Sequence, residues 1–529
     1  MILVIENKEL YAYEIHSLFK AFYPEEDVKV CAEGTPGYER FLAQREKERR
    51  QAERRVDLVF SPAQIAVTIE GQTFVRTREA VEESGDTAAR CGAPSGSGAD
   101  AAQAAAAASD APTSSAPPDF SAKNRACKDA LKHLLYDALC AVTGRTLPWG
   151  ELIGIRPTKL AMAMLREGRT ADEAAASMER LYRVSPEKAA LAADIAQREQ
   201  RILAPVHYED GYSLYIGIPF CPTTCLYCSF TSFPIAAWRT RVGEYLDALE
   251  KEMALTARLM EGRILDTVYI GGGTPTTLEP AQSERLLTAL ERYFDLGALN
   301  EFTVEAGRAD SITPEKLAVL KRHGVTRISV NPQTMNDKTL RLIGRHHNVE
   351  QVREAFYQAR EAGFDNINMD LILGLPGETQ EDVARTIAAV ETLSPDSLTV
   401  HSLAIKRASR LQQWIEQNGI SSIRNTDACM ALAAAGAARM EMKPYYLYRQ
   451  KNMSGNFENV GYAREGRYGV YNILIMEEKQ PIMALGAGSI SKAVFPGGRI
   501  ERSDNCKDVE TYIRHIDEML ARKEKLFAR

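Results

Sequence analysis

Three cysteines lie close together in the run GIPFCPTTCLYCSF, and their type and spacing say more about chemistry than any other residues. Cys221, Cys225 and Cys228 follow a C-x3-C-x2-C pattern, and the next cysteine in either direction is far away. Three thiolates at this spacing can each bind one iron of a cubane cluster and leave the fourth iron without a protein ligand. An open iron can bind and activate a small molecule. The spacing therefore predicts a 4Fe–4S cluster that takes part in chemistry.

Two other interpretations of the triplet stay open at this point. A structural zinc ion usually takes four ligands in two spaced pairs, and no second pair follows Cys228. An isolated group of redox-active thiols would show the same spacing without a metal. The spacing favours the cluster over both.

The composition is that of a globular protein without bulk positive charge. The 529 residues allow two to four domains, and 45% hydrophobic with 26% charged residues is ordinary for such proteins. A formal net charge of −6 argues against nucleic-acid binding that relies on positive charge. No apolar run is long enough to span a bilayer, so we expect no membrane association.

The first residues and the cysteine usage favour the cytoplasm. The opening run MILVIENKELYAYEI is interrupted by Glu6, Lys8 and Glu9 and makes a poor signal peptide. The cysteines outside the triplet are scattered, which suits free thiols in a reducing compartment. We therefore predict a cytoplasmic protein, and we expect a monomer.

The first part of the chain divides into three segments. Residues 1–82 alternate strand-like and helix-like runs and predict a small α/β module, ending in a hairpin that turns at Glu70-Gly71-Gln72. Residues 83–120 are dominated by small residues, and so few groups to bury predict a disordered low-complexity insertion. Residues 121–207 have apolar positions at helical spacing and predict a helical segment.

Residues 208–424 alternate short β-rich runs with amphipathic helices. This order predicts an α/β fold in which six parallel strands with right-handed crossovers form a partial (β/α)6 barrel. In parallel barrels the reactive groups lie at the carboxyl ends of the strands, and the cysteines follow the first strand as this rule requires. Residues 425–529 are expected to form a separate C-terminal region that covers the substrate, with a strand at 468–476. The predicted barrel strands are 213–219, 266–272, 301–307, 327–333, 367–373 and 397–404.

Further polar or flexible positions lie near the ends of these strands. The run Gly271-Gly272-Gly273-Thr274-Pro275 follows the second strand, and consecutive glycines let a backbone approach a ligand closely. Glu305 and Gln333 end the third and fourth strands, Arg345 follows Gln333, and Asp370 starts the fifth strand. Taken singly, each has an ordinary explanation as a tight turn, a helix cap or a solvated side chain. Their coincidence on consecutive strands predicts one site.

Two histidines follow Arg345 directly. His346 and His347 either donate protons to an acidic substrate or form an exposed surface pair. The sequence does not separate these alternatives.

The cysteine motif with its flanks resembles that of the radical S-adenosylmethionine (radical SAM) superfamily. From about residue 211 to 500 the chain resembles the oxygen-independent coproporphyrinogen III oxidase family, and within it the HemZ-type coproporphyrinogen dehydrogenases. The resemblance implies a 4Fe–4S cluster on the three cysteines, with SAM bound to the fourth iron and Tyr227 packed beside the cluster. The positions that match SAM contacts of the family are Tyr215, Gly272, Gly273, Thr274, Glu305, Gln333, Arg345, Asp370, Ala404 and Ile490.

The same resemblance implies a reaction and partners. In this family an electron from the cluster cleaves SAM into methionine and a 5′-deoxyadenosyl radical. The radical removes a hydrogen from the propionate side chain, and loss of carbon dioxide and one electron leaves a vinyl group. Two propionates of coproporphyrinogen III react in this way to give protoporphyrinogen IX. The implied partners are a tetrapyrrole substrate and an electron donor such as flavodoxin or ferredoxin.

Two positions differ from the family's diagnostic residues. The oxidase has a fourth cysteine two residues after the third, where this chain has Phe230, as the related haem chaperone does. The chaperone carries an HNxxYW motif, and the comparable stretch here, 449–453, reads RQKNM without a histidine. Two alternatives to the oxidase therefore stay open, which are a haem-binding, chaperone-like protein and a radical SAM enzyme that acts on another tetrapyrrole.

Overall fold

The computed structural model describes most of the chain, in two compact units. The first unit comprises residues 1–194 and 449–457, and the second comprises residues 195–448 and 458–529. The predicted insertion at 83–120 lies outside the described residues except for Phe120, and the five segment boundaries given above stay predictions. The described residues are 1–24, 26–48, 54–77, 120, 123–153, 156–230, 232–405, 409–419, 423, 425–450 and 457–528.

A five-stranded sheet opens the first unit. Its order is β2-β1-β3-β4-β5, with β1 parallel to β2 and β3, and with β4 antiparallel to β3 and β5. Glu70 and Gly71 both have positive φ (50° and 79°), the geometry of a tight two-residue hairpin turn, at the predicted place. The strands are β1 (Ile2–Glu6), β2 (Val28–Ala32), β3 (Arg54–Phe60), β4 (Gln64–Ile69) and β5 (Gln72–Thr77).

Helices complete this unit. Apolar side chains of β3 and β4, such as Leu58 and Val67, form one buried core with those of α1 and α5. Asn124 caps α5, since its side chain accepts a hydrogen bond from the backbone N–H of Cys127. Thr170 and Glu173 form a capping box at the start of α7. The helices are α1 (Ala12–Phe22), α2 (Pro36–Glu48), α5 (Arg125–Thr143), α6 (Pro157–Arg166), α7 (Ala171–Tyr182) and the first part of α8 (Pro186–Ile202), which continues into the second unit.

The second unit is built on an eleven-stranded sheet whose middle is parallel. The strand order is β14-β15-β13-β12-β11-β10-β9-β6-β16-β17-β18, and neighbours from β16 through β13 run parallel. The six predicted barrel strands are therefore present, side by side and in chain order. They are β6 (Gly211–Ile218), β9 (Ile264–Gly272), β10 (Glu301–Gly307), β11 (Arg327–Val330), β12 (Ile367–Leu373) and β13 (Ser397–Ser402).

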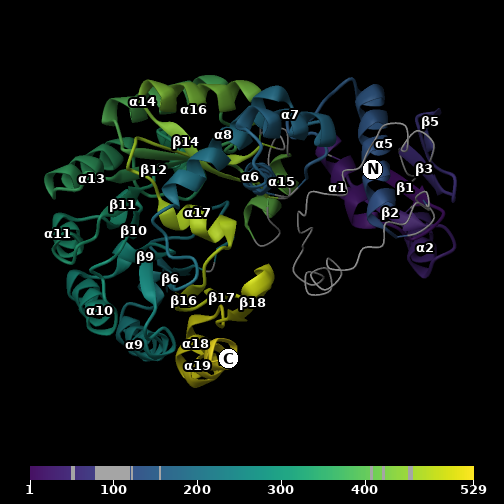
Figure 1. The fold of residues 1–529 in the computed structure, drawn as a ribbon. Coiled ribbons are helices and arrows are strands. Elements are labelled where there is room, and N and C mark those ends of the chain that lie inside the picture. Colours follow the sequence, from purple (N-terminus) through teal and green to yellow (C-terminus); the bar gives the residue numbers. More distant parts are fainter. Residues whose placement is uncertain are drawn as a thin grey trace. The chain divides into compact units, whose positions relative to one another are not determined.

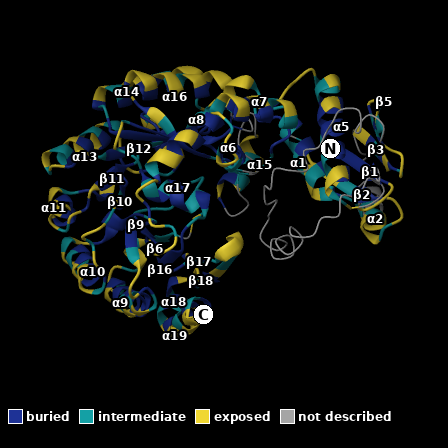
Figure 2. Ribbon diagram, in the orientation of Figure 1, coloured by how far each residue is buried: buried dark blue, intermediate teal, exposed yellow. Residues whose placement is uncertain are grey.

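Helices cover the outer face of this sheet (Figure 1). The exposed surface of these helices points outward, whereas the strands between them are buried (Figure 2). The prediction of a partial α/β barrel is confirmed. The helices are α9 (Val242–Leu259), α10 (Pro280–Tyr293), α11 (Pro314–Arg322), α12 (Asp337–Leu342), α13 (Val349–Glu361), α14 (Gln380–Leu393), α15 (Leu411–Asn418) and α16 (Asp427–Arg439).

The two faces of the parallel strands differ in polarity. Outward residues are apolar, and Ile270 and Val304 lie with Leu286 and Leu320 of the covering helices. Because strand side chains alternate, the next residues along each strand form a polar inner face. In register across β6, β9 and β10, this face begins with Ser213, Thr267 and Glu301. It continues with Tyr215, Tyr269, Thr303, Glu305, Arg327, Ser329, Asn368 and Asp370.

The C-terminal residues do not form a separate sheet. They extend both edges of the barrel sheet, with β14 and β15 beyond β13 and with β16 to β18 beyond β6. The added elements are β14 (Lys443–Tyr448), β15 (Asn459–Ala463), α17 (Val470–Glu477), β16 (Ile482–Leu485), β17 (Ile490–Val494), β18 (Ile500–Asp504), α18 (Val509–Arg514) and α19 (Ile516–Phe527).

The predicted strand at 468–476 is wrong, since most of this run is helix α17. A short apolar run rich in aromatic and β-branched residues is compatible with either a strand or a buried helix. Tertiary contacts favour the helix. The backbone N–H of Tyr471, in the first turn of α17, donates to the Glu301 carboxylate at 3.2 Å. Among the described residues, no helix is long and apolar enough to cross a membrane.

Candidate cluster and SAM site

The three cysteines lie at the carboxyl end of β6. Cys221 ends the short strand β7 (Phe220–Cys221), which pairs with β8 (Phe233–Pro234) and so closes the loop that carries Cys225 and Cys228. Cys221 and Cys225 are buried, and Cys228 is half-buried. The loop is therefore a closed structure with its thiols turned away from bulk solvent.

Three arginines from different segments bind this loop. Arg308 donates through Nη1 to the carbonyl and hydroxyl oxygens of Thr223, at 3.1 and 2.7 Å. Arg345 donates to the hydroxyl of Tyr227 at 3.2 Å, and Arg410 donates to the carbonyl of Thr224. The backbone adds bonds from Leu226 N to Ile343 O and from Leu411 N to Leu226 O. The cysteine positions are thus fixed by contacts with three neighbouring segments.

The three thiols have the chemistry that a cluster needs, since a 4Fe–4S cluster takes one thiolate per iron. Within the described ranges, no three His, Cys, Asp or Glu side chains are grouped closely enough to hold a single metal ion. Burial raises the pKa of the Cys221 thiol to about 11, although the Thr274 hydroxyl opposes the shift. Burial also raises the pKa of Cys228. Such thiols ionise when iron binds them.

The glycine turn after β9 lies against the cysteine strand. The backbone N–H of Gly273 donates to Ile218 O at 2.8 Å, and that of Thr274 donates to Phe220 O at 2.7 Å. A Cβ on Gly273 would lie 2.5 Å from Phe220 O, so only glycine fits there. The Thr274 hydroxyl lies 3.5 Å from Cys221 Sγ. The turn therefore sets the position of the first cysteine.

Glu305 projects from β10 into the polar inner face. The hydroxyl of Tyr269 donates to its carboxylate at 2.5 Å. Burial raises the pKa of the Glu305 carboxyl to about 7, while the Tyr269 bond acts to lower it. The ring of Tyr269 stacks on Tyr471 at 4.6 Å and on Tyr215 at 6.2 Å between centroids. Glu305 and Tyr215 are thus held in one tyrosine-lined wall.

The backbones of Gln333 and Asp370 are joined by a hydrogen bond. Gln333 follows β11 with an unusual positive φ of 68°, and its N–H donates to Asp370 O at 2.9 Å. Asp370 lies at the middle of β12 rather than at its start, and its carboxylate accepts a bond from Asn368 at 2.7 Å. The expectation that every polar candidate lies at a strand end is therefore wrong for Asp370.

Arg345 is buried beside the cysteine loop. Its Nη1 donates to the carbonyl of Asn331, and burial opposes its charge while Tyr227 and Cys225 raise the guanidinium pKa above its usual value. Nε of Arg345 and Oδ1 of Asn331 are buried without a hydrogen-bond partner among the described residues. Unpartnered buried polar atoms are rare in folded proteins. They fit the binding of a carboxylate and an amino or hydroxyl group of a ligand here.

The two apolar candidates, Ala404 and Ile490, both lie near the carboxyl ends of the barrel strands, but on opposite sides of the sheet. Ala404 follows β13, and Ile490 begins β17 and is 44% exposed. The turn before Ile490 approaches β6 closely, because a Cβ on Gly486 would lie 2.4 Å from Gly217 O. Of the two histidines, His346 is exposed, whereas His347 is buried, so the two do not form an exposed pair.

Sequence reasoning missed Arg308, Arg410 and Tyr269. Arg308 directly follows β10, so the rule that groups at strand ends reach the site would have found it. Arg410 lies in a poorly patterned segment and Tyr269 inside a strand, where neither has a local signal.

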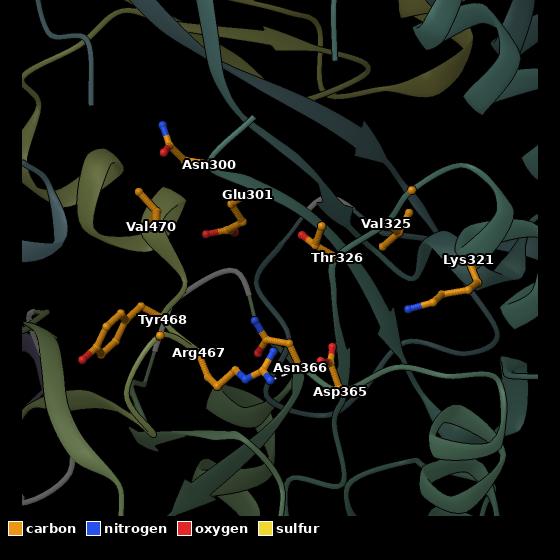
Figure 3. A pocket seen from close by; sticks show the side chains of 12 residues that line it. Asn300, Glu301, Lys321, Val325, Thr326, Asp365, Asn366, Arg467, Tyr468 and Val470 are labelled. Atoms are coloured by element: carbon orange, nitrogen blue, oxygen red, sulfur yellow. Dashed lines mark ion pairs between the residues drawn. The ribbon is translucent and has the colours of Figure 1, made fainter. Parts of the chain in front are cut away.

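A polar cavity of about 420 Å³ lies at the other end of the strands (Figure 3). It is lined by residues that precede β10, β11 and β12, with an ion pair between Arg467 and Asp365 at 3.1 Å. The candidate cluster site is thus separate from this cavity.

Comparisons with known proteins show the family of this chain. Residues 215–390 match the model of the radical SAM superfamily. The chain is 39% identical over 421 residues to the oxygen-independent coproporphyrinogen-III oxidase-like protein HemZ of Bacillus subtilis, covering 78% of this chain and 84% of that protein. It is 41% identical over 195 residues to the heme chaperone HemW of Bacillus subtilis, covering 37% of this chain and 51% of that protein.

Similarity to the oxidase itself is more limited. The chain is 36% identical over 208 residues to the oxygen-independent coproporphyrinogen III oxidase of Escherichia coli, and the match covers 39% of this chain and 45% of that protein. The solved structure of the coproporphyrinogen III oxidase HemN from Escherichia coli matches with a TM-score of 0.48 and 25% identity, over 60% of this chain and 72% of that one.

Proposed function

Because this chain belongs to the radical SAM superfamily and to the family of the oxidase-like protein HemZ, we propose that it decarboxylates propionate side chains of coproporphyrinogen III. The superfamily works with a 4Fe–4S cluster and SAM, in which a reduced cluster passes an electron to SAM and produces an adenosyl radical. The observation that carries the proposal is the position of Arg345. It joins the cysteine loop through Tyr227, and its unpartnered Nε is available to a carboxylate.

The proposed reaction removes one hydrogen atom, one carbon dioxide and one electron from each propionate. One hydrogen atom leaves the propionate carbon that is attached to the ring and β to the carboxylate, and converts the adenosyl radical to 5′-deoxyadenosine. The carbon–carboxylate bond then breaks, releasing carbon dioxide, and one electron passes to an external acceptor as the vinyl group forms. Two propionates react to give protoporphyrinogen IX. Each turnover of one side chain therefore consumes one SAM and one electron from a donor such as flavodoxin or ferredoxin.

Residues of this chain would bind and orient the reactants. Carboxylate and amide groups suit ribose hydroxyls, which gives Glu305 and Gln333 the role of holding the nucleoside. The guanidinium of Arg345 suits the carboxylate of methionine or of a propionate. The buried Cys221 and Cys225 and the half-buried Tyr227 would limit the access of water to the reacting atoms. Tyr215, Asp370, the 272–274 turn, Ala404 and Ile490 complete the proposed SAM contacts.

Anaerobic turnover tests this function. The reconstituted protein should convert coproporphyrinogen III, SAM and a one-electron reductant to 5′-deoxyadenosine, carbon dioxide and a divinyl product, through a three-propionate intermediate. Formation of 5′-deoxyadenosine without carbon dioxide would contradict this substrate and support another tetrapyrrole. A mixture without reductant is the control.

Haem delivery is a second candidate function, and Phe230 favours it. This residue stands where the oxidase family has a fourth cysteine, and its side chain is 71% exposed beside the cluster loop. A flat apolar group at that place could contact a porphyrin face. Stoichiometric haem binding without SAM cleavage, abolished by Phe230→Ser, would support this function over the first.

A further inference from the structure

Arg308 touches the cysteine loop but has no role among the proposed SAM contacts. Its Nη1 lies 3.9 Å from Cys225 Sγ, within the range of an N–H to sulfur bond, and also binds Thr223. The side chain is 3% exposed. A buried, permanently charged group thus lies against a cluster ligand, because a guanidinium keeps its proton in proteins.

Asp310 balances this charge on the side away from the loop. Its two carboxylate oxygens accept bonds from Nε and Nη2 of Arg308, at 3.0 and 2.6 Å. Burial acts to raise the pKa of Asp310, but His347 and Arg308 outweigh it and hold that pKa well below its usual range. Burial lowers the pKa of His347, whose Nδ1 lies 3.5 Å from Asp310. Arg308 and Asp310 therefore form an ion pair, with the imidazole of His347 beside the carboxylate.

We propose that Arg308 sets the reduction potential of the cluster and that Asp310 limits this effect, an inference that rests on the proposed function. Reduction adds one negative charge to the cluster. A fixed cation near a ligand sulfur stabilises the reduced form, and a hydrogen bond to that sulfur acts in the same direction. Asp310 binds the guanidinium through Nε and Nη2 rather than through the Nη1 that faces the sulfur, and offsets part of the positive field.

The two charges predict opposite effects on the midpoint potential. Arg308→Gln keeps a donor near Thr223 but removes the charge, so its potential should move to more negative values. Asp310→Asn leaves Arg308 uncompensated, so its potential should move to more positive values. Arg308→Lys keeps the charge and should stay close to the wild type. Loss of packing alone would not produce shifts of opposite sign.

Anaerobic redox titration of the holoprotein, followed by electron paramagnetic resonance of the reduced cluster, measures these potentials. Arg410→Gln is the matched control, because Arg410 binds the same loop through the Thr224 carbonyl rather than through a sulfur. Its potential should shift less than that of Arg308→Gln, because no bond to a sulfur is lost. Iron and sulfide content of each variant is determined in the same samples.

The outcomes separate this inference from the proposed function. Equal potentials in Arg308→Gln, Asp310→Asn and the wild type, or shifts of the same sign, would overturn the role of Arg308. If Arg308→Gln does not hold iron, the test rests on Asp310→Asn. An unchanged or more negative midpoint potential in Asp310→Asn would then overturn the inference. Wild-type protein that binds no 4Fe–4S cluster would instead contradict the proposed function.

Discussion

Lys523 and Glu252 form an ion pair in which neither side chain is exposed (0% for both). The pair joins α19 to α9. Glu252 also accepts bonds from the Tyr512 hydroxyl at 2.6 Å and from the backbone N–H of Gly486 at 2.8 Å. Since Gly486 lies against β6, the C-terminal helix helps to fix the turn that leads to Ile490.

Lys523→Met should destabilise the protein strongly. Removing one partner leaves a buried carboxylate without its counter-charge, which costs about 3–5 kcal/mol. Arg258→Met is the matched control, because Arg258 and Glu524 join the same two helices at 2.7 Å but are 65% and 52% exposed. That change should cost under about 1 kcal/mol. Denaturant unfolding of both variants compares the two, and equal losses would contradict the importance of the buried pair.

Glu305 should make stability fall as pH rises towards neutrality. Its pKa is raised from 4.5 to about 7 by burial, so between these values the folded state binds a proton that the unfolded chain has lost. The stability that this group contributes is complete below pH 4.5 and is lost as pH rises through about 7. Glu305→Gln should therefore gain stability relative to the wild type across this window, by at most about 3 kcal/mol. Thermal unfolding of the wild type and of Glu305→Gln at several pH values, without SAM, measures this gain in stability. Parallel pH profiles of the two proteins would refute the prediction.

Tyr269→Phe should weaken SAM binding at neutral pH and spare it at higher pH. The lost hydroxyl acts to lower the pKa of Glu305, so the carboxyl of the variant stays protonated to higher pH and accepts fewer bonds from ribose. A bond to a charged group contributes about 1.5–3 kcal/mol, which corresponds to at least about tenfold in affinity. Equilibrium binding at several pH values tests this. Tyr471→Phe keeps the stacked ring and is the control, and a deficit that persists at all pH values would point to a packing defect instead.

Gly273→Ala should displace the cysteine strand. The added methyl would overlap the Phe220 carbonyl at 2.5 Å, and this backbone has no room to retreat while Thr274 N binds the same oxygen. We expect reconstituted protein with clearly less iron per chain than the wild type. Gly243→Ala, at a position with nothing within 4 Å, is the control. Normal iron content in Gly273→Ala would show that the turn does not position the cluster.

Cys225→Ala should abolish the visible absorption of the reconstituted cluster. Loss of one of three thiolates leaves two irons without protein ligands, and the variant should retain little iron. Cys140→Ala, half-buried in α5 of the other unit, should be indistinguishable from the wild type. Full iron content in Cys225→Ala would exclude the cluster assignment.

The parallel strands could be predicted from the sequence because short β-rich runs alternate with amphipathic helices, an order that is typical of a parallel sheet with helical crossovers. The cysteine loop was identified from spacing alone. The helix α17 was not predicted, since it depends on contacts with distant residues such as Glu301. The Arg308–Asp310 pair was missed because opposite charges two residues apart are common on surfaces, and only burial distinguishes this one.

The added strands at the two sheet edges constrain how the chain can be made. Ser213 of β6 pairs with Ile482 of β16, and Ser397 of β13 pairs with Ala463 of β15. During synthesis both edges of the barrel sheet therefore keep open backbone hydrogen-bonding groups until β15 and β16 have left the ribosome. Such long-range pairing slows folding and exposes strand edges to other chains. Iron that reaches the cysteine loop before β15 and β16 have paired would therefore bind at an incompletely enclosed site.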